Sequence, residues 1–230
     1  MGAIYLVRHG QASFGAADYD RLSETGIEQA RVLGEALRPR LPSVEVAVTG
    51  AMQRHRQTAE ACLAAMGLAL EPRAVGGFDE FDHEQVLACY EPRYRDRAAL
   101  AQDLARAPEP RRAFQEIFAR AVARWVGGRH EGEYAEPWRV FRARAQAALE
   151  ALAPPLGRSK TALVFTSGGP IAAICAGLLG LADERSFELQ WVLVNCGLCK
   201  VLSGRRGLTL ASFNEHGHFE GARAHLLTHR

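Results

Sequence analysis

The chain opens with Ala3-Ile4-Tyr5-Leu6-Val7-Arg8-His9-Gly10-Gln11-Ala12-Ser13, and this stretch decides the fold. Five apolar or β-branched residues run directly into Arg8, His9 and Gly10, which predicts a short buried strand with a polar carboxyl end. Open α/β sheets bind ligands at that end of their strands. Arg8 can grip a phosphate through its planar fork, His9 can act as nucleophile or base near neutral pH, and Gly10 lets backbone approach a ligand. Alone, the triplet is better explained as a strand that merely ends in polar residues, because three residues are a weak motif.

Composition narrows the class of protein. The 230 residues are 48% hydrophobic, enough for one fairly large domain or a domain with an insertion. A net charge of +2 without a single-sign block does not indicate nucleic acid or an anionic membrane as partner. No apolar run approaches the ~20 residues of a membrane span, and no secretory signal opens the chain, so a cytoplasmic protein is expected. Five scattered cysteines predict buried thiols and no disulfide framework.

A second strand is expected to end in an anion site. Residues 44–48 alternate valine with other residues as a strand and lead through Thr49-Gly50 into a helix at 52–66. Arg54 lies in the first turn of that helix, off its apolar stripe, so it can reach back toward the strand end. A helix amino terminus favours anions through its unpaired N–H groups and its dipole. The alternative is an ordinary surface arginine beside His55 and Arg56.

A third strand repeats the pattern. Thr161–Phe165 reads as a buried strand that runs into Thr166-Ser167-Gly168-Gly169, and Pro170 fits the first turn of a helix that continues to Leu179. Small hydroxyls, paired glycines and a helix start together form a concave set of N–H donors suited to phosphate.

The segment Gly76–Glu84 is dense in carboxylates. A solvated acidic loop is the ordinary interpretation, yet Phe78 and Phe81 can anchor it against the body of the protein and leave Glu80 near an active site. A partly desolvated glutamate is suited to general-acid work.

The remaining elements complete an α/β chain. A helix capped by Ser23 or Thr25 carries an apolar stripe of Ile27, Ala30, Leu33 and Leu37. Further strands are expected at 68–75, 187–194, 198–203 and 208–213, and about three helices between 85 and 153. We therefore predict a three-layer α/β/α sandwich around a mostly parallel sheet, organised as a single domain, 1–230, with a helical insertion at about 84–155.

At this point the chain resembles the histidine phosphatase superfamily, the phosphoglycerate mutase-like group, over essentially its whole length. The resemblance rests on the following motifs: Arg8-His9-Gly10; Leu22-Ser23-Glu24-Thr25-Gly26 with Gln29-Ala30; Arg54 with Gln57-Thr58-Ala59; Asp79-Glu80-Phe81-Asp82; Gly168-Gly169-Pro170-Ile171; and Asn214 with His218.

The resemblance implies a phosphohydrolase that acts without metal or cofactor on a small phosphorylated substrate, with inorganic phosphate as a further ligand. His9 would become a phosphohistidine, Arg8 and Arg54 would hold the equatorial oxygens, and Glu80 would protonate the leaving group and then activate water. Gly10, Ser167 and Gly168 are further phosphate-binding candidates. The fold is also one in which a homodimer can form.

One position departs from the family pattern, because Ser167 stands where the family has a second histidine. Losing such a preorganised donor costs roughly 10²–10³ in rate, so we expect weak or atypical phosphomonoesterase activity and expect Ser167→His to raise turnover. His83, His216 or His218 could compensate; the last two alone make a weak metal site. The alternatives are an impaired phosphate-binding or regulatory protein and, less favoured, a phosphoglycerate mutase. Serine hydrolase chemistry is disfavoured, because Phe165 stands where a nucleophile elbow needs glycine.

Overall fold

The computed structural model describes residues 1–13 and 20–229. The chain divides into two compact units, residues 1–80 with 144–230 and residues 81–143. Part of the loop between the first strand and first helix, residues 14–19, lies outside the described residues. The single-domain organisation with an insertion at about 84–155 stays a prediction.

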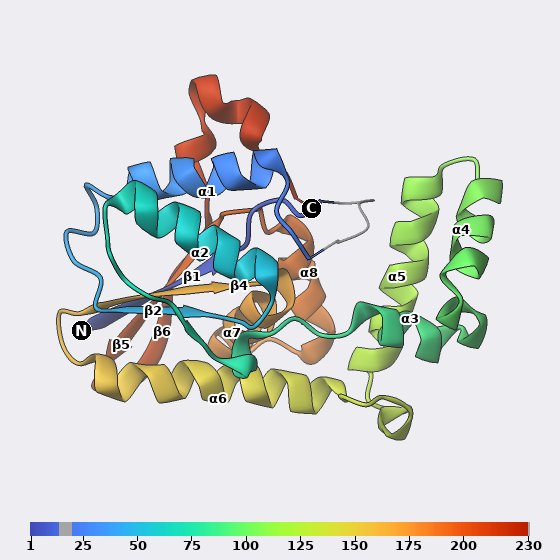
Figure 1. The fold of residues 1–230 in the computed structure, drawn as a ribbon. Coiled ribbons are helices and arrows are strands. Elements are labelled where there is room, and N and C mark those ends of the chain that lie inside the picture. Colours follow the sequence, from blue (N-terminus) through green and yellow to red (C-terminus); the bar gives the residue numbers. More distant parts are fainter. Residues whose placement is uncertain (14–19, 230) are drawn as a thin grey trace. The chain divides into compact units, whose positions relative to one another are not determined.

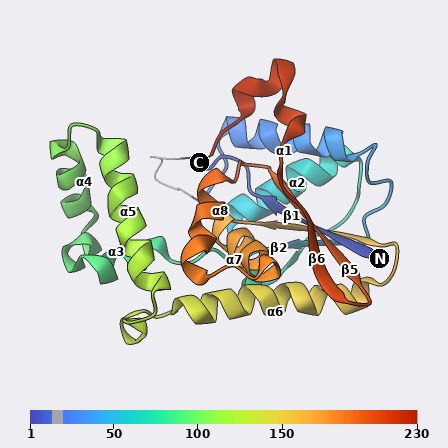
Figure 2. The same cartoon turned by 180° about the vertical axis from the view of Figure 1, so that it is seen from behind.

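The first unit is built on one six-stranded sheet with the order β3-β2-β4-β1-β5-β6 (Figure 1). Its strands are β1 (Gly2–Arg8), β2 (Val46–Thr49), β3 (Arg73–Ala74), β4 (Thr161–Thr166), β5 (Leu198–Gly204) and β6 (Gly207–Glu215). The strands from β3 to β1 run parallel, whereas β5 and β6 pair antiparallel at the other edge, which Figure 2 shows from behind. The prediction of a mostly parallel sheet is confirmed.

Alternation along β1 explains the layers. Tyr5 and Val7 enter a core with α1 (Glu24–Leu37) and α2 (Gln53–Met66), whereas Ile4 and Leu6 enter a core with α6 (Trp138–Leu156) and α7 (Gly168–Leu179). Successive strand side chains point to opposite faces, so one apolar strand fills both cores. Figure 1 shows these helix pairs on opposite faces of the sheet, which makes the three layers of the predicted sandwich.

An N-cap residue determines where the first helix begins. Ser23, not Thr25, caps α1, because its hydroxyl accepts the N–H of Gly26 at 3.1 Å. Ala30, Leu33 and Leu37 are buried, but Ile27 is exposed, so the predicted apolar stripe starts one turn later than expected.

Two strand predictions need correction. Residues 187–194 do not form a strand, because Ser186–Val192 is a short helix, α8. Their alternating apolar pattern does not correspond to a buried face, since Trp191 and Val192 are exposed, and β5 already occupies the place beside β1. The edge strand expected at 68–75 is reduced to β3, whose two residues pair with β2. Pro72, which lacks a backbone donor, precedes it.

The second unit, residues 81–143, is helical. Its helices are α3 (His83–Tyr90), α4 (Arg97–Arg106) and α5 (Pro110–Val126), followed by the beginning of α6. The expectation of about three helices between 85 and 153 falls one short, because Pro92 begins a 3₁₀ turn and Asp96 caps a new helix. Phe81 packs among the aromatic rings of this unit. Its ring centroid is 4.8 Å from that of Trp125 and 5.6 Å from that of Phe141.

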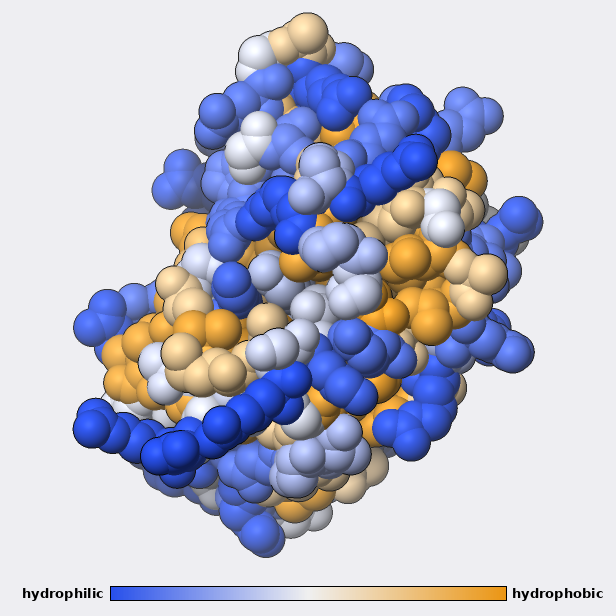
Figure 3. Space-filling model, turned by 90° about the vertical axis from the view of Figure 1, so that its left-hand side faces the viewer, coloured by the Kyte–Doolittle hydropathy of each residue, from blue (hydrophilic) through white to orange (hydrophobic). Residues whose placement is uncertain are grey.

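Over the part of the chain that is described, no helix combines the length and apolar character needed to cross a membrane. Figure 3 views the molecule from the left-hand side of Figure 1, and on this face hydrophilic side chains interrupt the apolar ones. The five cysteines are free thiols; four of them are buried, as the sequence predicts, whereas Cys89 is only half-buried.

Candidate active site at the carboxyl ends of β1, β2 and β4

His9 follows the last residue of β1. Its N–H donates to the carbonyl of Thr166 at 2.8 Å, which extends the β1–β4 pairing by one step and brings His9 beside Ser167. The residue is only 7% exposed. Its Nδ1 lies 2.7 Å from the carbonyl oxygen of Gly10. Because a carbonyl only accepts, the proton belongs on Nδ1, and the lone pair stands on Nε2.

The surroundings of His9 keep it neutral. Burial lowers its pKa well below the ordinary value, and the positive charges of Arg54 and then Arg8 lower it further. A neutral imidazole is the form that can act as a nucleophile at pH 7.

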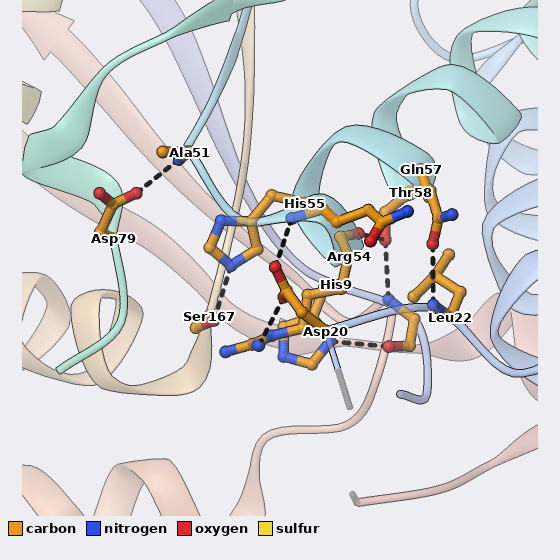
Figure 4. Close-up of polar contacts among 12 residues, drawn as sticks. His9, Asp20, Leu22, Ala51, Arg54, His55, Gln57, Thr58, Asp79 and Ser167 are labelled. Carbon is orange, nitrogen blue, oxygen red and sulfur yellow. Dashed lines mark hydrogen bonds and ion pairs between the residues drawn. The ribbon is translucent and has the colours of Figure 1, made fainter. Parts of the chain in front are cut away.

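Arg54 is a buried residue, contrary to the alternative of a surface arginine. It lies in the first turn of α2 with its side chain 8% exposed, and its Nη1 is 2.8 Å from Oδ1 of Asp20. The other oxygen of Asp20 accepts the N–H of Gln53 at 2.8 Å, so one carboxylate both caps α2 and orients the guanidinium. In Figure 4, Arg54, His9, His55 and Ser167 converge on one place.

Arg8 ties the site to the end of the chain. Its Nη1 donates to the carbonyls of Leu193 and His229, the latter at 2.9 Å. Its Nε lies against Gly168, where a Cβ would come within 3.7 Å of it. Arg8 and Gly168 therefore stand together where β1 ends and α7 begins.

Gly10 has a packing role. A Cβ here would lie 2.4 Å from the carbonyl oxygen of Gly26, so only glycine lets α1 approach the end of β1. The Gly10 N–H donates to Oγ1 of Thr58 at 3.0 Å, and this amide is therefore engaged within the protein.

Glu80 lies at the amino end of α7, where its Oε2 accepts the N–H of Gly169 at 3.2 Å. The preceding turn is fixed from two sides. Arg144 donates to the carbonyls of Gly76, Gly77 and Asp79, and Thr166 donates through Oγ1 to the carbonyl of Phe78. Phe78 itself is buried, so the acidic segment is anchored as expected and not a freely solvated loop.

His55 belongs to this site although its sequence position did not predict it. Its Nε2 lies 2.7 Å from Oγ of Ser167, both side chains are fully buried, and the His55 ring centroid is 5.7 Å from that of His9 (Figure 4). The available signal was a histidine next to Arg54 in a chain whose expected histidine at position 167 is a serine.

A second missed residue supports His9 from behind. The side-chain amide of Asn195 donates to the carbonyl of His9 at 3.0 Å, and its oxygen accepts from Thr228 at 2.9 Å. Gln29 donates to Thr228 and to the carbonyl of Leu226, and accepts from the N–H of Gln11. Gln29 and Asn195 are fully buried, so this polar network fixes the backbone of the site.

The other candidate histidines have different partners. Nδ1 of His216 donates to the carbonyl of Asn214 at 2.6 Å. The ring of His218 lies against that of Phe219, with centroids 4.2 Å apart. His83 begins α3 in the second unit. Within residues 1–13 and 20–229, no group of three or more metal-ligating side chains is present.

A model of the histidine phosphatase superfamily, branch 1, matches residues 4–216. The chain belongs to the histidine phosphatase superfamily. The superfamily and fold that the sequence predicts are confirmed, and this membership supports the predicted enzyme class, the phosphoric monoester hydrolases.

Solved structures with the same fold cover nearly the whole chain. A mutant phosphoserine phosphatase from Entamoeba histolytica, in complex with phosphoserine, has a TM-score of 0.67 at 16% identity, covering 95% of this chain and 99% of that one. Phosphoglycerate mutase from Bacillus anthracis has a TM-score of 0.63 at 18% identity, with 94% of each chain covered. Mycobacterial glucosyl-3-phosphoglycerate phosphatase has a TM-score of 0.62 at 20% identity, covering 93% and 99%. No curated protein sequence matches the chain.

Proposed function

We propose that the chain is a phosphomonoesterase in which His9 carries the phosphoryl group as a phosphohistidine. The observation that carries this proposal is the state of His9, a buried neutral imidazole with Nδ1 on the Gly10 carbonyl and its charge-free form favoured by Arg54 and Arg8. Such a ring offers one nucleophilic nitrogen, Nε2, in a fixed direction.

In the first half of the reaction, Nε2 of His9 attacks phosphorus in line with the ester oxygen, and the bond from phosphorus to that oxygen breaks. The two arginines and the N–H of Gly168 stabilise the charge on the equatorial oxygens. Glu80, which is positioned by the hydrogen bond that its Oε2 accepts from the Gly169 N–H, gives its proton to the departing alkoxide, which leaves as an alcohol.

In the second half, the Glu80 carboxylate takes a proton from water as the water oxygen attacks the phosphohistidine. Inorganic phosphate forms, the Nε2–phosphorus bond breaks, and His9 and Glu80 return to their starting states. One carboxyl group therefore serves as acid and then as base.

The substrate is proposed to be a small phosphorylated metabolite. The structural relatives include phosphoserine and glucosyl-3-phosphoglycerate phosphatases, and one of the structures holds 3-phosphoglyceric acid. These compounds define a first panel of substrates. A homodimer, expected from the fold, remains a prediction.

The test is turnover of p-nitrophenyl phosphate and the metabolite panel by the parent protein and by His9→Ala. His130→Gln is a matched control, because His130 is an exposed histidine of the second unit whose Nδ1 pairs with Glu133. We expect the control to keep full activity and His9→Ala to lose it. Binding of phosphate or vanadate without any His9-dependent turnover would instead support the alternative, a phosphate-binding or regulatory protein.

A further inference from the structure

His55 and Ser167 come from separate elements and meet inside the site. His55 lies in the first turn of α2 and Ser167 directly after β4, and their side chains are fully buried with Nε2 and Oγ 2.7 Å apart. Two buried polar groups at this distance form a hydrogen bond, and its direction depends on which ring nitrogen of His55 carries the proton.

The surroundings of Nδ1 indicate which ring nitrogen of His55 carries the proton. Nδ1 of His55 is buried, and no residue in the described part of the chain hydrogen-bonds to it. A Cβ at Gly50 would lie only 2.4 Å from Nδ1, so Gly50 packs directly against this side of the ring, and the nearby Oδ1 of Asp79 accepts the N–H of Ala51. Orphaned buried N–H groups are rare, whereas an acceptor without a partner is tolerated more often. The proton therefore belongs on Nε2, which donates to Oγ of Ser167.

This direction leaves the serine hydroxyl with a proton to give. A hydroxyl has one donor and two acceptor positions, and His55 uses an acceptor position. Ser167 stands at the N-cap position of α7 but makes no side-chain capping bond, and for its Oγ–H the described residues show no acceptor. Because His9 pairs through its N–H with Thr166, the hydroxyl is beside the nucleophile.

We propose that His55 is a positioning residue that holds Ser167 so that the Ser167 hydroxyl donates a hydrogen bond to the phosphoryl group during its transfer to His9. The inference rests on the proposed function and deepens it. The imidazole expected at position 167 is supplied from α2, one residue after Arg54, and it acts through a serine.

His55 stays neutral in this role. Burial lowers its pKa to about 3, and the charge of Arg54 acts in the same direction. The donor that reaches the phosphoryl group is therefore an uncharged hydroxyl, and its contribution does not titrate near neutral pH.

The opposite direction of the same hydrogen bond has a different meaning. If Oγ–H donated to Nε2, the pair would have the arrangement of a serine nucleophile with its base, and Nδ1–H would be left buried without an acceptor. The two arrangements predict different tautomers and different consequences for His9→Ala.

The experiment combines kinetics with a measurement that needs no turnover. His55→Leu removes the donor, His55→Gln keeps an N–H at the same reach, and Ser167→Ala removes the hydroxyl. We expect His55→Leu and Ser167→Ala each to lower kcat about 10²-fold with little change in KM, and His55→Gln to recover most of that loss. The double variant His55→Leu/Ser167→Ala should be no slower than either single variant, because both changes remove one unit.

Side-chain ¹⁵N NMR of the parent protein, free and with orthovanadate bound, reads the tautomer directly. We expect His55 as the neutral Nε2–H form in both states, and weaker vanadate binding in Ser167→Ala. Additive losses in the double variant, an Nδ1–H tautomer of His55, or unchanged vanadate binding would overturn the positioning role. If the parent shows no His9-dependent turnover, the proposed function fails, whereas the tautomer and vanadate measurements still decide the inference.

Discussion

Replacing Glu80 by glutamine separates proton transfer from every other contribution of the site. Glutamine keeps an oxygen that can accept the Gly169 N–H, and the turn before it stays fixed by Arg144 and by the Thr166 hydroxyl. The fold should therefore be unchanged, while the proton needed by the leaving group is gone.

The size of the effect depends on the leaving group. General-acid catalysis contributes about 10²–10⁴-fold, which is roughly 3–5 kcal/mol of transition-state stabilisation, when the leaving group is a basic alkoxide. p-Nitrophenolate needs no proton to depart. We expect Glu80→Gln to lose about 10²–10⁴-fold in kcat/KM on an alkyl phosphate of the substrate panel, but less than about tenfold on p-nitrophenyl phosphate.

The assay is kcat/KM for both substrate types, measured for the parent, Glu80→Gln and the control Glu71→Gln. Glu71 is an exposed carboxylate of the same unit, before β3, and its substitution should change neither substrate. Equal losses of Glu80→Gln on both substrates would refute the reasoning, because a general acid must discriminate between leaving groups.

Three further results are expected. Thr58→Val keeps the shape of a fully buried side chain but leaves the Gly10 N–H without its acceptor, so urea unfolding should show a loss of about 1–3 kcal/mol; a change below 0.5 kcal/mol would contradict this. Because the folded pKa of His55, about 3, lies below the ordinary 6.5, stability is full above about pH 6.5 and falls as the pH drops toward 3. His55 should account for about 2 kcal/mol of the loss between pH 7 and pH 5, so His55→Gln should flatten that part of the urea-unfolding profile. Ser167→His alone should not raise turnover, whereas Ser167→His with His55→Ala should exceed the single variant; equal rates would show that the two positions do not share one space.

This last expectation reverses what the sequence predicts for Ser167→His. The sequence alone predicts that restoring a histidine at position 167 is enough to raise turnover. In the structure Ser167 is fully buried and His55 already occupies the adjacent space at 2.7 Å, so a second imidazole would overpack the site. The sequence could not reveal this, because the two residues are brought together by tertiary packing of α2 against the end of β4.

Much of the fold was predictable for a simple physical reason. The strands β1, β2 and β4 are short apolar segments, each ending in Arg, Thr or small polar residues, and such segments are recognised by periodicity alone. Helix α8 was not predictable in this way. Its apolar residues alternate as in a strand, but β5 occupies the position beside β1. Local periodicity does not reveal which distant segments pair in the sheet.

The candidate site shows the same division. Arg8, His9, Arg54 and Ser167 were predicted from their positions at strand ends or helix starts, and Glu80 from an acidic segment flanked by two phenylalanines. The structure brings these residues to one edge of the sheet. Their partners were not found, since Asp20 for Arg54 and Asn195 for His9 are contacts between segments that are far apart in the chain.

The central claim is that His9 becomes phosphorylated, and rapid quenching tests it most directly. The parent protein is mixed with substrate, stopped within milliseconds in base, digested and analysed by mass spectrometry. The account predicts one phosphate on the peptide that contains His9, stable in base and lost in acid, and none in His9→Ala. A phosphate on Ser167 instead, or turnover of His9→Ala at the parent rate, would contradict it.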